Sequence, residues 1–177
     1  IRTGIVSGRP LTIAEESCFM FLIHDITDQK TAENALRNSE ANLRTIFETS
    51  PFAIVINRLS DGVYLKVNPA FERIAGFRES ETLGKTSFEL GLNRSREEFT
   101  QFTDLLRRER IITDATIHTF TRTGVERIIL FSSALIQYNG EEAILTITVD
   151  MTETKRMEEQ LRQAQKLDAL GQLAGGI

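Results

Sequence analysis

The spacing of hydrophobic and polar residues changes along the chain, and each change marks an expected element. Residues 28–47 carry apolar or small side chains at alternating intervals of four and three, which is typical of one narrow stripe on a helix. A continuous apolar run follows at 52–56. Val63, Leu65 and Val67 then alternate with aromatic or charged neighbours, as in a half-buried strand. The pattern therefore predicts a long helix followed by two strands.

Short capping and turn signals divide the remainder. Asn68-Pro69 ends the second strand and opens a short helix, because Pro is favoured in the first turn of a helix. Ser95 and Glu98 form a capping box in which the Ser hydroxyl accepts the backbone amide of Glu98, and a longer helix follows. From Ile111 the pattern returns to strands, with Asn139-Gly140 as a strong hairpin signal. This order predicts an α+β fold, a five-stranded antiparallel sheet with its helices on one face.

Two segments one domain length apart have similar sequences. Asp25–Arg37 and Asp150–Arg162 are identical at six of thirteen positions, and each follows a β-like run. A strand, an Asp-x-Thr junction and a helix therefore occur twice in the same order, which predicts tandem domains. The expected parts are the last two strands of a preceding domain at 1–27, a linker helix at 28–47, a complete domain at 48–152 and a second helix at 153–177.

Composition limits the possible partners and location. The 177 residues include 21 Lys and Arg against 25 Asp and Glu, for a formal net charge of −4, so the basic face that nucleic-acid binding requires is not expected. No apolar run approaches the roughly 20 residues of a membrane span, so we expect no membrane contact by this segment. A single cysteine, Cys18, cannot form an intramolecular disulfide, which favours the reducing cytoplasm. A membrane anchor elsewhere in the parent chain stays open.

The sequence shows no combination of residues typical of catalysis or metal binding. His24 and His118 lie far apart on expected strands, and with Cys18 they give no metal-ligand spacing. The glycines near the C-terminus lack the preceding strand and the following Lys of a phosphate-binding loop. We therefore expect no catalytic residue and no metal site in this chain.

Five short motifs resemble those of a PAS domain. They are Ser50-Pro51, Asn68-Pro69-Ala70-Phe71, Gly76-Phe77, Leu83-Gly84-Lys85 and Asp150-Met151-Thr152, a variant of the usual closing Asp-Ile-Thr. The resemblance covers about residues 40–152, and Asp25-Ile26-Thr27 closes a truncated first copy. It implies a sensor module that binds a small ligand between sheet and helices, or that dimerises and relays signals without one.

Six apolar residues are expected to converge between the sheet and the helices. A packed core would use the same residues, and the sequence leaves both interpretations open. Haem-binding PAS domains carry a His on the long helix, and flavin-type light sensors carry a Cys in that region. Residues 95–110 contain neither residue. Haem is therefore disfavoured, no cofactor is assigned, and a non-covalent flavin stays open. The six residues are Val67, Phe71, Phe99, Phe102, Leu106 and Ile117.

Residues 163–177 resemble the start of the dimerisation and phosphoacceptor domain of sensor histidine kinases, especially in Leu-Gly-Gln-Leu-Ala-Gly-Gly-Ile. In that family Ala-His follows, and the His receives phosphate from ATP. The resemblance implies a parent kinase that signals to a response regulator, and a fragment without kinase activity because the acceptor His and the ATP-binding domain are absent. The alternatives are a ligand-free dimerisation module, or a different output such as a cyclic-dinucleotide synthase or a transcription factor.

The two Asp-x-Thr junctions are the expected points of signal coupling. Thr152 is expected to cap the following helix by accepting a first-turn N–H, and Asp150 to pair with a basic group or with sheet amides. Asp25 and Thr27 are their counterparts. Two coiled-coil-type stripes predict a parallel homodimer through the flanking helices: Leu36-Ser39-Leu43-Ile46 and Met157-Leu161-Ala164.

Overall fold

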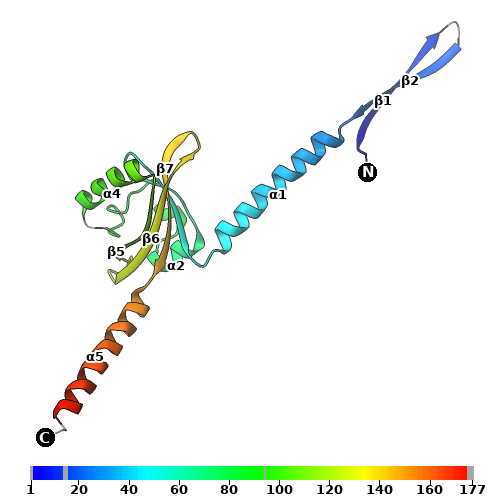
Figure 1. The fold of residues 1–177 in the computed structure, drawn as a ribbon. Coiled ribbons are helices and arrows are strands. Elements are labelled where there is room, and N and C mark those ends of the chain that lie inside the picture. The colour runs from blue at the N-terminus through cyan, green and yellow to red at the C-terminus, as the bar shows by residue number, and fades with distance from the viewer. Residues whose placement is uncertain (1, 14–15, 94, 175–177) are drawn as a thin grey trace. The chain divides into compact units, whose positions relative to one another are not determined.

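A computed structural model describes residues 2–13, 16–93 and 95–174 of the chain (Figure 1). The chain divides into two compact units, Ile1–Ile46 and Phe47–Ile177. The boundary falls inside the long helix α1 (Thr27–Thr49), which agrees with the 4-3 stripe expected over residues 28–47.

The first unit begins with a two-stranded hairpin. Strands β1 (Gly4–Ile13) and β2 (Glu16–Asp25) pair in antiparallel fashion, from Gly4 opposite Asp25 to Ile13 opposite Glu16. The large apolar side chains described in this hairpin, such as Ile5 and Ile23, are exposed, and Phe19 keeps 69% of its surface open. Helix α1 begins two residues after β2. The strands of this hairpin thus have the apolar side chains of buried strands, although these side chains are exposed.

The second unit contains an antiparallel sheet, which among the described residues has the strand order β4-β3-β7-β6-β5. Asn139 and Gly140 both have positive φ, at 51° and 85°, and this matches the two-residue turn that joins β6 to β7. The expected α+β fold with five antiparallel strands is confirmed. The strands are β3 (Ala53–Arg58), β4 (Tyr64–Val67), β5 (Ile111–Phe120), β6 (Glu126–Tyr138) and β7 (Glu141–Asp150).

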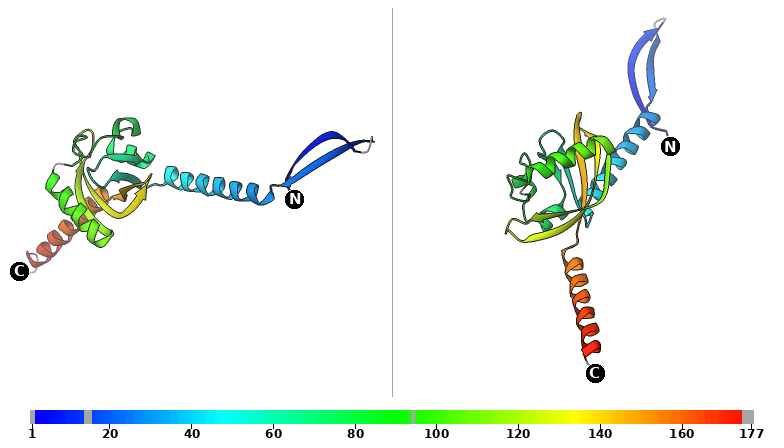
Figure 2. Two further views of the ribbon diagram at one scale, coloured as in Figure 1. Left: turned by 90° about the horizontal axis from the view of Figure 1, so that it is seen from above. Right: turned by 60° about the vertical axis from the view of Figure 1, so that its left-hand side comes forward.

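Two helices of this unit begin at the places that the sequence predicts, after Asn68 and after Ser95. Asn68 accepts the backbone N–H of Phe71 at 3.1 Å, and Ser95 accepts that of Glu98 at 3.2 Å. In Figures 1 and 2, α4 lies against the sheet and α5 leaves from the end of β7. The helices are α2 (Pro69–Ala75), α3 (Glu79–Thr82), α4 (Arg96–Glu109) and α5 (Thr152–Ala174).

Among the described residues of this unit, most buried hydrophobic side chains belong to one of two clusters. One surrounds Val67 and Phe71, where α2 packs against β3 and β4. The other joins Leu59, Leu106 and Ile144, where α4 packs against the opposite part of the sheet. Since native cores are normally close-packed, a division between two clusters leaves room for a cavity.

The two long helices expose the apolar stripes that the sequence predicts. Leu43 in α1 is 65% exposed and Leu161 in α5 is 61% exposed. The helices themselves agree with expectation, whereas their association into coiled coils stays a prediction. Gly175, Gly176 and Ile177, which belong to the kinase-like motif, lie outside the described residues.

The sequence repeat extends to strand pairing. Adding 125 to Gly4 and Asp25 gives Ile129 and Asp150, and these two also face each other, across β6 and β7. The same offset converts each of the ten pairs of the β1–β2 hairpin into a pair of the β6–β7 hairpin. Both hairpins therefore have ten pairs in the same register, although few of their side chains are identical.

Candidate functional site: a cavity beside the output junction

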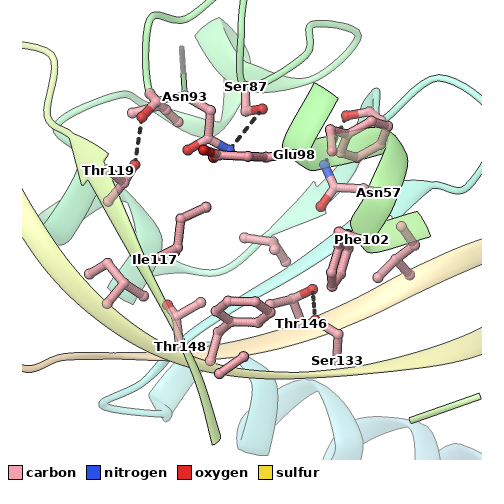
Figure 3. Close-up of a pocket in the computed structure, with 18 of the residues that line it drawn as sticks. Asn57, Ser87, Asn93, Glu98, Phe102, Ile117, Thr119, Ser133, Thr146 and Thr148 are labelled. Atoms are coloured by element: carbon pink, nitrogen blue, oxygen red, sulfur yellow. Dashed lines mark hydrogen bonds between the residues drawn. The ribbon is translucent and has the colours of Figure 1, made fainter. Parts of the chain in front are cut away.

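A cavity of about 500 Å³ lies between one face of the sheet and helices α2 and α4 (Figure 3). Its size falls within the range of small-molecule sites, roughly 300–1,000 Å³. The lining comes from both core clusters, so the cavity occupies the gap between them.

The sheet side of the cavity is built by alternate residues of β6 and β7, because successive strand residues point to opposite faces. Phe131 and Ser133 project from β6, and Thr146 and Thr148 from β7. The hydroxyls of Ser133 and Thr146 are 2.8 Å apart and hydrogen-bond to each other (Figure 3). The wall therefore offers hydroxyl groups, and Arg127 of β6, within an otherwise apolar surface.

The helix side is mainly aromatic. Phe102 of α4 meets Phe131 edge to face, with ring centroids 5.7 Å apart. Phe99 packs against the turn between β3 and β4, where a Cβ on Gly62 would lie 2.7 Å from the ring. Gly62 also has a φ of 75°, so both its conformation and the close approach of Phe99 require glycine.

A second polar group lies across the cavity from Thr146 and Ser133. Figure 3 shows Ser87, Asn93 and Glu98 close together there, with Asn57 to one side, where its amide donates to the carbonyl of Gly62 at 3.1 Å. The Asn93 amide donates to the Ser87 hydroxyl at 3.3 Å. Tyr64 also lines the cavity, and burial raises the pKa of its hydroxyl above the ordinary value of 10.0.

The structure separates the six pocket residues expected from the sequence into two sets. Phe71, Phe99, Phe102 and Ile117 line the cavity. Val67 and Leu106 do not, because their side chains are buried in the two packed clusters on either side. Sequence reasoning missed the polar lining, since the hydroxyl and amide groups come from strands and loops distant in sequence.

The last strand is joined to α5 by a compact set of polar contacts. The Thr152 hydroxyl accepts the backbone N–H of Ile128 at 3.0 Å and donates to Asp150. Asp150 accepts the backbone N–H of Thr152 at 2.9 Å, and its other oxygen lies 3.3 Å from Nη1 of Arg127. Asp150 thus joins the start of α5 to β6. Its contact with Arg127 is the pairing with a basic group that the sequence predicts.

The capping role expected of Thr152 needs correction. Thr152 is the first residue of α5, and its hydroxyl bonds to strand β6 rather than to an amide of its own helix. The side chain that accepts an amide at the helix start is that of Asp150. The physical reason is that the β6 amide lies directly beside the hydroxyl, while the preceding carboxylate already reaches the helix amide.

The N-terminal junction repeats this arrangement. The Thr27 hydroxyl accepts the backbone N–H of Thr3 at 2.9 Å and donates to Asp25 at 2.6 Å. Asp25 also accepts the backbone N–H of Thr27 at 3.0 Å. These hydrogen bonds from Thr27 lower the pKa of Asp25 below its ordinary value of 3.8.

Other chemistry is sparse in the described part of the chain. No cluster of three His, Cys, Asp or Glu side chains suited to a metal ion occurs among the described residues. His118 lies on β5 and contacts Glu126 at 3.0 Å at an exposed position. None of the described helices combines the length and the hydrophobicity that a bilayer crossing needs.

Comparison with known proteins agrees with this arrangement. The family model described as the PAS fold matches residues 47–156. The chain belongs to the PAS family. Residues 47–156 include the whole cavity-lining sheet and the Asp150–Thr152 junction, so both features belong to the PAS domain.

One curated relative is Sensor protein FixL of Bradyrhizobium diazoefficiens, 24% identical over 172 residues. The match covers 86% of this chain and 32% of that protein, so this chain spans about a third of the relative's length. Among solved structures, the PAS domain of an HTR-like protein from Haloarcula marismortui has a TM-score of 0.55 and 25% identity over 68% of this chain and 98% of that one. A domain of a sensory box sensor histidine kinase/response regulator from Geobacter sulfurreducens shares the fold, with a TM-score of 0.55. The two are 24% identical, and the match covers 65% of this chain and 96% of that one.

Proposed function

We propose that this chain is the cytoplasmic sensory and relay segment of a two-component sensor histidine kinase. A small ligand would occupy the PAS cavity and alter the sheet, and the change would pass through the β7–α5 junction to a kinase core beyond Ile177. The observation that carries this proposal is that the cavity wall and the junction share strands β6 and β7. The match to a sensor protein and the resemblance of residues 163–177 favour a kinase over the other outputs.

The proposed relay needs two arrangements of the junction that differ in stability with and without the signal. Asp150 and Thr152 are the proposed coupling residues, because their side chains join helix α5 to β6 directly. A matched control is Thr100, whose hydroxyl bonds only to the carbonyl of Arg96 within α4.

The test uses the parent kinase with Asp150→Asn, Thr152→Ala or Thr100→Ala, and follows phosphate transfer from labelled ATP. We expect altered basal autophosphorylation or a lost stimulus response in the first two variants and wild-type behaviour in the third. Wild-type regulation in all three would contradict the relay. The isolated chain of 177 residues should retain no label, because the sensory segment that we propose does not include the phosphoacceptor His.

We further propose that the segment forms a parallel homodimer through α1 and α5, and that a response regulator is the partner of the parent kinase. The exposed stripes carry this part of the proposal, since Leu43 and Leu161 are more than half exposed in the single chain. Analytical ultracentrifugation should show a dimer at high micromolar concentration, weakened by Leu161→Asp. A wild-type chain that sediments only as monomer would contradict it.

Residues 1–27 are proposed to be the closing strands of a preceding PAS copy. The support is that the β1–β2 hairpin and the following junction repeat the register and bonds of β6–β7. Adding the preceding residues of the parent protein should protect the amides of β2 from hydrogen exchange. Unchanged exchange in the longer chain would contradict this assignment.

A further inference from the structure

Arg127 belongs to both the cavity and the junction. It lies on β6 two residues before Ile129, and both side chains line the cavity. Nη1 of Arg127 lies 3.3 Å from Asp150, the residue that binds the first amide of α5. A charge-assisted pair is usually about 2.7–2.9 Å long, so this contact is loose.

A second nitrogen of the guanidinium has no partner in the described part of the chain. Its Nε is buried and has no hydrogen-bond partner among the described residues. Within that part of the chain, the ion pair through Nη1 is the only polar contact of the group. An unpaired buried donor is unfavourable, so an acceptor at the Nε–Nη2 edge would be strongly stabilised.

The charge of the cavity lining indicates what that acceptor is. Arg127 is the only cation among the described lining residues, and Glu98 is the only anion. Glu98 lies with Asn93 and Ser87, across the cavity from Thr146 and Ser133 (Figure 3). The unpaired Nε of Arg127 favours an acceptor on the ligand, and Glu98 disfavours a second negative charge, so the site suits a ligand with one negative charge at Arg127 and an apolar body beside Phe102 and Phe131.

We propose that the cavity takes a small aryl or alkyl monocarboxylic acid, whose carboxylate binds the Nε–Nη2 edge of Arg127 while Nη1 remains on Asp150. One guanidinium then joins the ligand to the start of α5. Because Nε is sealed in the present arrangement, the side chain must turn toward the cavity to meet the carboxylate, and since Nη1 remains on Asp150, this turn shifts the Asp150 carboxylate with it. This inference rests on the proposed function, since it presupposes a ligand in the PAS cavity.

The same residue types recur in sequence at the N-terminal junction. Adding 125 to Arg2 gives Arg127, just as it converts Asp25 and Thr27 into Asp150 and Thr152. The three residue types therefore recur together at the same spacing.

The test compares three probes of the same shape and different charge: 3-phenylpropionate, 3-phenylpropanol and 3-phenylpropylamine. Each is titrated into the ¹⁵N-labelled 177-residue chain and followed by NMR. Arg127→Gln removes the positive charge. Arg127→Lys keeps the charge but lacks the planar guanidinium, which can bind a carboxylate through two N–H groups at once. Arg58→Gln is the matched control, because Arg58 is 34% exposed against 33% for Arg127 and is likewise paired with carboxylates, but lies outside this cavity.

We expect the acid to bind about tenfold or more tightly than the alcohol and the amine, the size of one charge-assisted hydrogen bond. The Arg127 Nε–H signal and the Thr152 amide should shift together. The preference should persist in Arg58→Gln, weaken in Arg127→Lys and vanish in Arg127→Gln.

Each other outcome is decisive. Equal or tighter binding of the alcohol, or an acid preference that survives Arg127→Gln, would overturn the inference while leaving a ligand-binding PAS cavity. No binding of any probe at millimolar concentration would overturn the inference and count against the ligand in the proposed function as well. Tight acid binding without a shift at Thr152 would contradict the connection to α5.

Discussion

The chain contains the same hairpin twice, and the two copies share their backbone pairing but differ in their surroundings. In the β6–β7 copy, β3 and β5 flank the hairpin and the cavity-facing side meets α4. In the β1–β2 copy, the corresponding side chains are exposed. The aligned pair Phe19 and Ile144 gives the contrast in numbers, with 69% and 2% of their surfaces exposed. Register and junction are therefore local properties of the repeated segment, whereas burial comes from the rest of the domain.

The largest expected effect comes from truncating each residue of the aligned pair, Phe19 and Ile144, to alanine. Ile144→Ala should destabilise the second unit by about 2–5 kcal/mol, because it removes a buried side chain from a packed cluster. Phe19→Ala should change stability by less than about 0.5 kcal/mol, because its ring is exposed. Urea unfolding followed by circular dichroism measures both. A similar loss in the two variants would mean that the first hairpin is covered in solution.

A smaller effect is expected at the two junction hydroxyls. Thr152→Ala leaves the backbone N–H of Ile128 without its acceptor at a part-buried position and should cost about 1–2 kcal/mol. Thr27→Ala affects the equivalent amide of Thr3, which is exposed and can bond to water, and should cost less than about 0.5 kcal/mol. Hydrogen exchange at Ile128 and Thr3 reports each loss separately. Faster exchange at Thr3 than at Ile128 in the wild type is part of the same expectation.

The smallest effect concerns the acidity of Asp25. Hydrogen bonds from Thr27 lower its pKa below 3.8 in the folded chain, so Thr27→Ala should move the pKa back toward that value. Since the folded pKa is depressed, the stability from this contact is present above the unfolded pKa and is lost as pH falls through the folded one. A ¹³C carboxyl titration of both proteins measures the shift. An unchanged pKa would assign the lowering to another group.

Much of the fold was predictable because its signals are local. The helix start at Asn68-Pro69, the Ser95 cap and the Asn139-Gly140 turn each depend on their own neighbours, and each occurs in the structure as expected. The hairpin repeat likewise follows from two similar stretches of sequence.

The cavity lining was less predictable because it depends on packing across the fold. Val67 and Leu106 have the same apolar character as Phe71 and Phe102, and only the division of the core separates cavity residues from buried ones. Ser133 and Thr146 read as polar positions on strands, and their meeting across β6 and β7 requires the register. The hydroxyl of Thr152 had two possible partners, and the position of Ile128 decided between them.

The matching register has a consequence for how such chains are assembled from parts. A splice that joins His24 directly to Asp150 removes 125 residues, yet the new joint keeps the Asp, the Thr and a strand amide for the Thr hydroxyl. The strand ladder would continue in phase, and α5 would start where α1 had started. Recombination at this joint would thus add or delete a complete unit without redesign of its ends, so the segment from Asp25 to Val149 has the properties of an exchangeable cassette.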